Sequence, residues 1–520
     1  MSGSDPRRWW ALGALSLVVL AVALPATILS VALPTLASAL DATAAELQWF
    51  VSAYTLVLAA GVLPGGLLGD RFGRKRMLLV ALVVYAGGSV LAAASTSPGM
   101  FIAAQAVLGF GAALVVPLVL SGLTVMFTPE ERPRAVGIWA TANFVALPLG
   151  PIVGGWLLSN FWWGWVFLMN LPIIALALVA VIVLLPESRS ETRPALDPVG
   201  VATSSIGLGV LTFGLVKAGQ DGWGSAGALG GMLGGLALLV AFGLWERALG
   251  RRSPGRTLVD LSLFASARFT WGTILAGLGI FAFFGLMFAT PQYFQAVLGT
   301  DAMGSGIRLL PLLGGMMVGA GLADRVADRL GAKVTVTAGF AILGAALVLA
   351  TATSATSGYG LAAAWIALGG LGAGLALATA SSAALATIDA ERSGVASALM
   401  QAVQKLGSPL SAAILGSVLN AGYADGLDLT GLPGRAADAV RESVYAGVAA
   451  ADRLGSAQLL LDVRSAFVDG LDRMLWVSAA VAVVGVVLTL LFLPARAPRV
   501  AAVEAEHAES DHEVGFPTQR

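Results

Sequence analysis

The fold of this chain is decided by one short stretch, which reads Gly65-Gly66-Leu67-Leu68-Gly69-Asp70-Arg71-Phe72-Gly73-Arg74-Lys75-Arg76. An apolar run ends at Leu68, and a second apolar run begins at Met77. Between them stand an acid, a glycine and four cations. Lys and Arg in short loops are retained in the cytoplasm, so the pattern predicts two membrane-spanning helices joined by a cytoplasmic loop. The loop is too short to reach a distant element, and we expect its charges to act on the ends of neighbouring helices.

The composition agrees with a chain that lies mostly in a membrane. Of its 520 residues, 57% are hydrophobic and 12% are charged, whereas roughly 25% of a soluble globular chain is charged. A formal net charge of zero argues against a nucleic-acid partner. The chain has no cysteine, which excludes disulfides, thiolate catalysis and cysteine-ligated metals. It also has no Walker loop, nucleotide-binding glycine fingerprint or metal-ligand spacing, so we expect neither an enzyme nor a bound cofactor.

Apolar runs of about 20 residues, the length that spans a bilayer, occur fourteen times. They lie near 9–36, 47–69, 77–96, 99–126, 134–158, 162–185, 198–219, 226–246, 268–291, 303–323, 333–353, 358–388, 394–421 and 473–494. The first run is read as a retained helix rather than a signal peptide. Cations concentrate in the loops that follow even-numbered helices, which predicts a multi-pass protein of the inner (plasma) membrane with both termini in the cytoplasm.

A weaker copy of the basic loop occurs downstream, where Asp328-Arg329-Leu330-Gly331 matches Asp70-Arg71-Phe72-Gly73. The repeat indicates two related halves. It resembles the signature loop between helices two and three of the major facilitator superfamily, a resemblance that implies an all-α membrane protein built from two six-helix bundles.

In that family the loop latches the two halves together. The resemblance therefore implies a gating role for six residues of this chain: Asp70, Arg71, Gly73, Arg74, Asp328 and Arg329. The alternative is a loop that only anchors the helix ends on the inner face of the membrane.

Two further helices between the halves resemble the fourteen-helix drug:proton antiporter branch of the family. The expected organisation is an N-terminal cytoplasmic segment (1–8), an N-terminal six-helix bundle (9–185), two linker helices with their flanking loops (186–267) and a C-terminal six-helix bundle (268–494). The loop 422–472 is expected to form an extracellular helical hairpin, since it contains two amphipathic stretches. The acidic segment 495–520 is expected to be a disordered cytoplasmic tail. It carries His507 and His512, for which a solvated tail is preferred over a metal site.

The fifth span contains Gly150-Pro151-Ile152-Val153-Gly154-Gly155. Proline kinks a helix, and adjacent glycines let a neighbouring helix pack close. The run resembles the antiporter motif of exporters, which favours export over import. Plain helix packing is the alternative interpretation.

Three positions depart from the family pattern. Pro25 stands where the family usually has an aspartate, Gln105 where it has an arginine implicated in proton transfer, and Ser52 where related quaternary-ammonium exporters have an acid. No carboxylate is expected at mid-membrane depth. An intramembrane acid is the usual carrier of a proton or a cation, so its absence questions the standard proton-coupled mechanism.

One ionisable residue, Lys405, is predicted to lie deep in the membrane. A charge at that depth costs several kcal/mol, so it should face the interior or a watery cavity. The predicted substrate cavity consists of Tyr54, Gln105, Asn143, Gln401, Gln404 and Lys405. A cationic cavity favours anionic or neutral lipophilic substrates. The alternative is a lysine that extends toward the membrane surface or bonds a neighbouring carbonyl as structural support.

Taken with the resemblance, these features predict a monomeric multidrug-type efflux transporter that exports lipophilic small molecules by alternating access in contact with membrane lipid. The family implies a proton gradient as the driving force. Two alternatives stay open. One is an exporter of an anionic or neutral metabolite or lipid without standard proton coupling, and the other is a non-transporting membrane sensor or scaffold.

Overall fold

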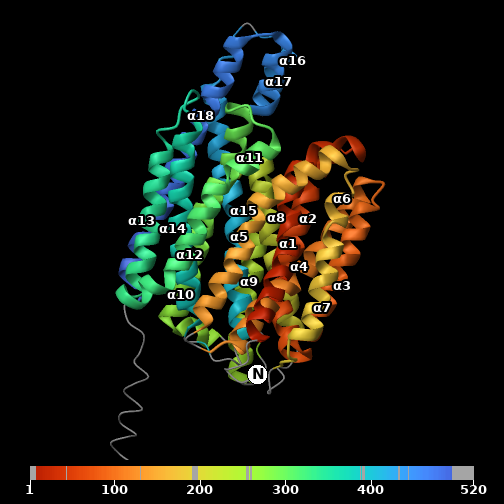
Figure 1. Cartoon of the computed structure of the whole chain (residues 1–520), viewed down its shortest axis with the longest axis vertical. Coiled ribbons are helices and arrows are strands. Elements are labelled where there is room, and N and C mark those ends of the chain that lie inside the picture. The colour runs from red at the N-terminus through yellow and green to blue at the C-terminus, as the bar shows by residue number, and fades with distance from the viewer. Residues whose placement is uncertain are drawn as a thin grey trace, which may run out of the picture.

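A computed structural model describes residues 7–494, apart from 43, 129–130, 190–196, 253–256, 258–260, 387, 389–392, 431, 433 and 443. Every regular element in this described part is a helix (Figure 1). The first half contains α1 Arg7–Ala39, α2 Ala44–Phe72, α3 Arg74–Ala93, α4 Pro98–Met126, α5 Arg132–Asn160, α6 Trp165–Leu168, α7 Asn170–Leu184, α8 Pro198–Asp221 and α9 Ala226–Arg252. The second half contains η1 Leu261–Ala265, α10 Ala267–Gln292, η2 Tyr293–Val297, α11 Ala302–Arg308, α12 Leu310–Leu330, α13 Ala332–Ala350, α14 Tyr359–Leu385, α15 Ser393–Gly426, α16 Gly434–Glu442, α17 Val444–Leu454 and α18 Ala457–Phe492.

The described helices account for the fourteen expected spans. Twelve candidate spans are long and apolar enough to cross a membrane, with α6 and α7, α10 and η2, and α11 and α12 each forming one span together. The helices α5 and α15, which are 29 and 34 residues long, complete the set. α1 begins and α18 ends on one side of the molecule, called here the terminal side, and α16 and α17 project from the opposite side, called the hairpin side (Figure 1).

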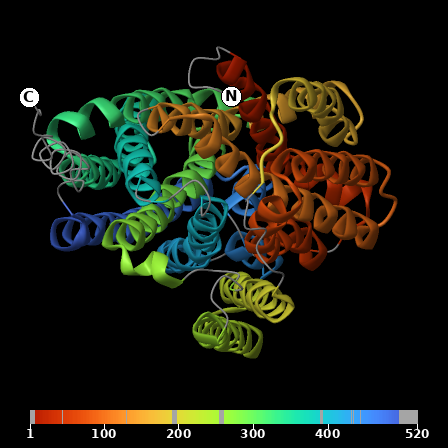
Figure 2. The ribbon, with the colours of Figure 1, turned by 90° about the horizontal axis from the view of Figure 1, so that it is seen from below.

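The spans form two bundles with a separate pair of helices beside them (Figure 2). α1–α7 make the N-terminal bundle, whose buried core includes Phe50, Phe101 and Phe167. α10–α15 and α18 make the C-terminal bundle, with Phe340 and Trp365 in its core. α8 and α9, called here the linker pair, lie outside both bundles.

The two bundles meet through apolar side chains on the terminal side. Leu385 at the end of α14, and Leu399 and Met400 near the start of α15, belong to the same buried cluster as the core of the N-terminal bundle. On the hairpin side, α5 of the N-terminal bundle lies against α11 and α12 of the C-terminal bundle. The shared cluster of Leu385, Leu399 and Met400 shows that the interface between the bundles is packed at its terminal-side end.

The segment 422–472 holds α16, α17 and an extension of α18. The final span was expected to begin near residue 473, but α18 runs without a break from Ala457 to Phe492. Gly470 lets this helix continue past α15, because a Cβ there would collide with the backbone oxygen of Leu419. The second arm of the hairpin and the last span are therefore one helix. Arg464 on that arm donates from Nε to the carbonyl oxygen of Ala296, at 3.0 Å, next to the end of η2.

Candidate functional site

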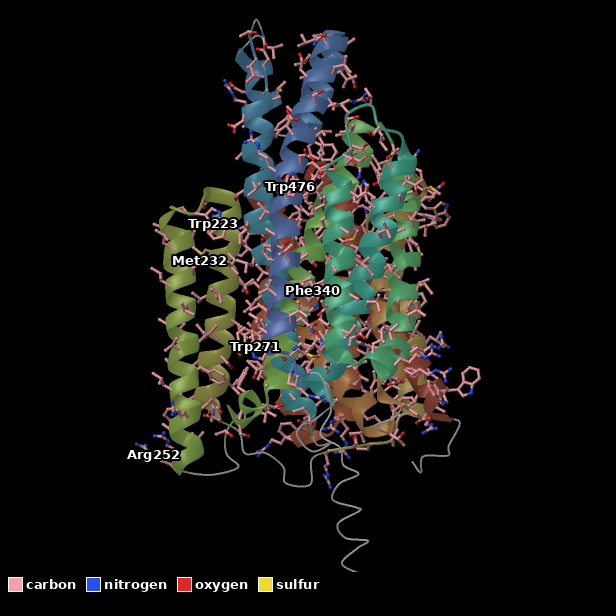
Figure 3. The ribbon with its side chains drawn as sticks, turned by 90° about the vertical axis from the view of Figure 1, so that its left-hand side faces the viewer. Trp223, Met232, Arg252, Trp271, Phe340 and Trp476 are labelled. Carbon is pink, nitrogen blue, oxygen red and sulfur yellow. The ribbon has the colours of Figure 1, made fainter. Side chains whose placement is uncertain are left out.

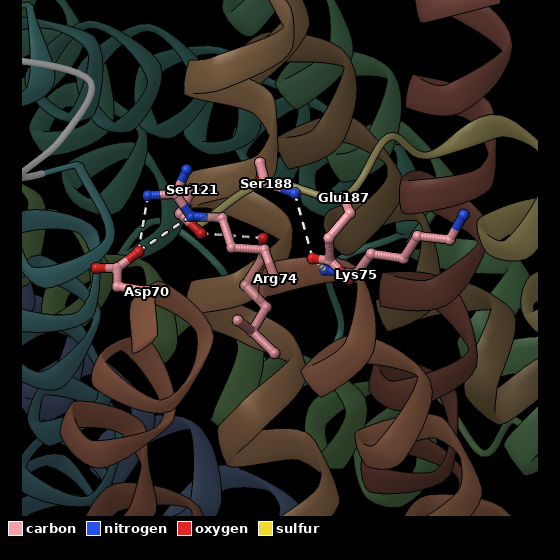
Figure 4. Close-up of polar contacts among 7 residues, drawn as sticks. Asp70, Arg74, Lys75, Ser121, Glu187 and Ser188 are labelled. Carbon is pink, nitrogen blue, oxygen red and sulfur yellow. Dashed lines mark hydrogen bonds and ion pairs between the residues drawn. The ribbon is translucent and has the colours of Figure 1, made fainter. Parts of the chain in front are cut away.

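The loop between α2 and α3 contains a buried ion pair (Figure 4). Asp70 is 1% exposed and Arg74 is 5% exposed. The guanidinium of Arg74 donates to Asp70 Oδ1 from Nη2 at 2.7 Å and from Nε at 3.0 Å. Two charges removed from water stabilise each other only with good geometry and hydrogen bonds, and this pair has both.

Gly73 turns the chain between the two helices. Its amide donates to Gly69 O at 3.0 Å, and its own carbonyl accepts from the Met77 amide at 3.0 Å, so it ends α2 and begins α3. It has φ +106°, a conformation that side-chain-bearing residues rarely adopt. A Cβ at this position would also lie 2.5 Å from Glu187 Oε1.

Glu187, which the sequence did not single out, is the second acid of this loop. Its Oε1 accepts from the Lys75 amide at 3.2 Å, and its Oε2 lies 3.7 Å from Arg76 Nε. The Lys75 ammonium donates to Ile182 O at 2.7 Å. The loop is thus anchored to the end of α7 (Figure 4). Glu187 is 112 residues from Lys75 in sequence, and no local pattern joins the two.

The downstream copy has the same backbone but a different charge arrangement. Gly331, with φ +87°, donates to Ala327 O at 2.8 Å and accepts from the Thr335 amide at 3.2 Å. Asp328 and Arg329 are exposed. Ala332 occupies the place that Arg74 has in the first copy, so the buried ion pair has no equivalent there.

The glycines of α5 receive side chains of α1. A Cβ at Gly150 would collide with Thr27 Oγ1, and one at Gly154 would lie 2.6 Å from Ile28 Cγ2. Gly155 faces the other bundle instead, where a Cβ would lie 3.6 Å from the Met303 backbone nitrogen of α11. α5 continues as a helix through position 151, and the side chain of Pro151 lies outside the described residues.

Two predicted cavity residues, Tyr54 and Gln105, come from neighbouring helices of the N-terminal bundle. The hydroxyl of Tyr54 donates to Val22 O at 3.4 Å, and the hydroxyl of Tyr85 donates to the same oxygen at 3.1 Å. Gln105 is 3% exposed and lies one turn before Gly109. A Cβ at Gly109 would lie 2.5 Å from Tyr54 O, so α2 and α4 touch here.

Three others lie on α15 of the C-terminal bundle. Gln401 is 4% exposed, and Lys405, four residues on and on the same face, is half-buried. Gln404 Nε2 donates to Ser381 Oγ of α14 at 3.4 Å. The side chain of Asn143 lies outside the described residues. Among the described side chains, no hydrogen bond or ion pair joins Tyr54 or Gln105 to these α15 residues, although α15 packs on both α2 and α4.

The buried carboxylates of the described chain lie at helix ends on the terminal side. They are Asp70, Asp197 and Glu246. Asp197 caps α8, accepting from the Val199 amide at 3.2 Å, and its Oδ2 accepts from Trp245 Nε1 at 2.8 Å. A Cβ at Gly200 would meet carboxylate oxygens of both Asp197 and Glu246. The Asp-Pro start of a span predicts this cap, but the contact with α9 needs the fold.

These features define a class of protein: a polytopic transporter with two packed helical bundles. Each bundle has a basic loop that turns at a glycine, Gly73 or Gly331. Comparison with known proteins agrees, since residues 15–412 match the model of the Major Facilitator Superfamily. The chain belongs to this superfamily.

Known relatives extend over nearly the whole chain. The chain is 32% identical over 501 residues to the tetracenomycin C resistance and export protein of Streptomyces glaucescens, covering 94% of this chain and 92% of that one. It is 33% identical over 493 residues to the multidrug efflux pump LfrA of Mycolicibacterium smegmatis, covering 92% and 96%. The crystal structure of a bacterial homologue of the human lysosomal transporter Spinster has the same fold, with a TM-score of 0.60 and 18% identity over 96% of this chain and 100% of that chain.

Proposed function

We propose that this protein exports lipophilic small molecules across the plasma membrane by alternating access. The observation that carries the proposal is full-length similarity to two relatives whose names describe antibiotic export and multidrug efflux. Two bundles around a central site are the usual architecture for rocking transport. In this structure the terminal-side end of the interface is packed by Leu385, Leu399 and Met400, so these contacts must separate when the cavity opens to that side.

The orientation follows from charge. α1 begins on the terminal side, and the chain returns there at the end of α2, so the basic loop of Arg74, Lys75 and Arg76 lies on that side. Short basic loops are retained in the cytoplasm. We place the terminal side, with both termini, in the cytoplasm and the hairpin outside. We further propose that the protein works as a monomer surrounded by lipid.

We propose that the substrate cavity forms between α15 and the helices α2 and α4 when the two bundles move apart, with Lys405 supplying its positive charge. A half-buried lysine in a membrane helix needs a polar environment, and Gln401 shares its face. The cavity therefore favours anionic or neutral lipophilic compounds over cations. Transport driven by a proton gradient would need other residues than those the family usually uses. At the usual positions this chain has Pro25, Ser52 and Gln105, whose side chains do not carry a titratable proton.

The gating role belongs to the Asp70 loop. The Asp70–Arg74 pair is buried and hydrogen-bonded, and its loop joins α2, α3 and the end of α7. The second loop lacks such a buried pair, so we expect the first loop to contribute more to gating than the second. We propose that the first loop keeps the ends of α2, α3 and α7 together, so that they move as one unit when the terminal-side interface opens and closes, and that the second loop lacks this restraint.

A dye-efflux assay tests the cavity. Cells expressing the protein, Lys405→Gln or Lys405→Arg are loaded with an anionic or a cationic lipophilic dye, with and without a protonophore. We expect the protein to expel the anionic dye, Lys405→Gln to lose this activity at normal expression, and Lys405→Arg to keep part of it. Preferential efflux of the cationic dye, unchanged in Lys405→Gln, would contradict the proposed cavity.

A further inference from the structure

The linker pair touches both bundles, although it belongs to neither. α8 packs against α2 of the N-terminal bundle and against α15 of the C-terminal bundle. Figure 3 shows the pair at the edge of the molecule, with Trp223 toward the hairpin side and Arg252 at the terminal side. Nothing in the two-bundle architecture requires such a pair, so its contacts are the guide to its role.

The two helices of the pair form one rigid unit. Gly214 and Gly231 bring their backbones together, since a Cβ at Gly231 would lie 2.5 Å from the Gly214 Cα. A Cβ at Gly235 would lie 2.6 Å from the Leu211 Cα. Small residues allow such close approach between membrane helices. Any movement of α8 relative to a bundle therefore carries α9 with it.

The contact with α2 is broad and interlocked. Phe213 of α8 stacks on Trp49 of α2, with ring centroids 6.0 Å apart and an interplanar angle of 27°. Further along α8, Leu208 is buried, and Gly209 lies against α2, where a Cβ would be 3.6 Å from the Ala60 Cβ. Close-packed interiors of this kind resist sliding.

The contact between α8 and α15 is made largely by small side chains. Gly219 of α8 lies against Ala413, and Ala218, Ala228 and Ala413 form a small buried cluster of their own. The described polar link is a single hydrogen bond of 3.3 Å from Trp223 Nε1 to Ser417 Oγ. This contact has neither the ring stacking of the α2 contact nor a backbone approach as close as that of Gly214 and Gly231. Packed helices can shear past one another by small movements, and we take this surface as the one that slides.

We infer that the linker pair is a side wall fixed to the N-terminal bundle, which covers the membrane-facing seam between α2 and α15 while α15 slides along it. The inference rests on the proposed export of lipophilic compounds. Such compounds dissolve in lipid, so an open seam between rocking bundles would let them leave sideways. α5, α11 and α12 close the opposite seam directly, and the linker pair closes this one.

The chain offers a matched pair of crosslinks to test the wall. It has no cysteine, so engineered pairs react without background. An ideal Cβ at Gly209 lies 3.6 Å from the Ala60 Cβ of α2, and one at Gly219 lies 3.6 Å from the Ala413 Cβ of α15. Both separations suit a disulfide, for which Cβ atoms lie about 3.5–4.5 Å apart.

The experiment compares Ala60→Cys/Gly209→Cys with Gly219→Cys/Ala413→Cys in the full chain, oxidised and then reduced with dithiothreitol. The first crosslink, to α2, should leave dye efflux intact. The second, to α15, should abolish efflux, and reduction should restore it. Loss of efflux with the α2 crosslink alone would mean that the linker pair is attached to the C-terminal bundle instead. No loss of efflux with either crosslink would mean that the linker pair does not border the moving interface. Each of these results overturns the inference.

A second readout separates this inference from the proposed function. Crosslinking yield, measured on gels with and without an imposed proton gradient or added dye, should change for the α15 pair and stay constant for the α2 pair. Equal changes in crosslinking yield at the two cysteine pairs would overturn the inference of a side wall. If the unmodified protein shows no efflux, that result counts against the proposed export but not against the side wall, because the crosslinking yields are measured without transport.

Discussion

At the scale of single residues, the loop after α2 depends on an ion pair and a glycine. The resemblance of this loop to the family loop implies that its acid and its cations pair with each other, so pairing of Asp70 with Arg74 across the Gly73 turn is predictable. Their near-complete burial is not, since it depends on α4 and on the chain after α7. Glu187, 112 residues from Lys75, could be found only from the fold.

Replacing Gly73 by Ala should destabilise the protein by about 1–3 kcal/mol, the usual cost of a strained backbone position. The reason is its φ of +106° and the collision with Glu187. Gly222→Ala is the control, because Gly222 has φ +87° but nothing within 4 Å of its Cβ. Thermal unfolding of the purified variants should show a larger loss for Gly73→Ala. Equal losses would show that the contact with Glu187 contributes nothing.

Removing one member of the buried pair should cost more than removing both. Asp70→Ala leaves the Arg74 guanidinium buried without its partner, for which about 3–5 kcal/mol is typical. The double variant Asp70→Ala/Arg74→Ala removes that buried charge and should unfold at a higher temperature than Asp70→Ala. Asp221→Ala, which breaks the half-exposed pair with Lys217, serves as the control and should cost at most about 1 kcal/mol. A double variant less stable than Asp70→Ala would contradict this account.

At the scale of helices, apolar runs of about 20 residues were sufficient to locate the spans. Each expected run corresponds to a helix or to a joined pair, and the copied loop predicted the related turns at Gly73 and Gly331. The continuity of α18 was missed, because the amphipathic stretch before residue 473 and the apolar run after it differ in composition and were assigned to separate helices. Likewise, the glycines of α5 read as a packing motif, but which helix each one faces is a property of the fold.

An alanine scan along α5 should separate these glycines. Gly150→Ala and Gly154→Ala push α1 away from α5, through Thr27 and Ile28, and should lower both thermal stability and efflux. Gly155→Ala should be tolerated, since its Cβ would make ordinary contacts 3.6–3.9 Å from Met303. The three variants differ by one methyl group each, so they control for one another. A loss that is greatest at Gly155 would mean that the contact with the other bundle is the tighter one.

At the scale of the whole molecule, composition and loop charges predicted a multi-pass membrane protein, the resemblance of the basic loop implied a two-bundle transporter, and the family assignment confirms that class. The cavity was harder to predict. Tyr54 and Gln105 belong to the N-terminal bundle, and Gln401, Gln404 and Lys405 to the C-terminal bundle, so their relation changes as the bundles move. A sequence gives the identity of such residues but not the distances between helices in each state.

Export itself is tested most directly with purified protein in sealed liposomes. An anionic lipophilic dye is placed on the side of the basic loop, and a proton or other ion gradient is imposed across the membrane. The orientation of the protein is measured by protease cleavage of the loops in a separate sample of the same liposomes. The account predicts that dye accumulates on the hairpin side beyond its equilibrium level, and that Lys405→Gln liposomes fail to accumulate it. Equal dye concentrations on both sides for the unmodified, folded protein under every imposed gradient would contradict it.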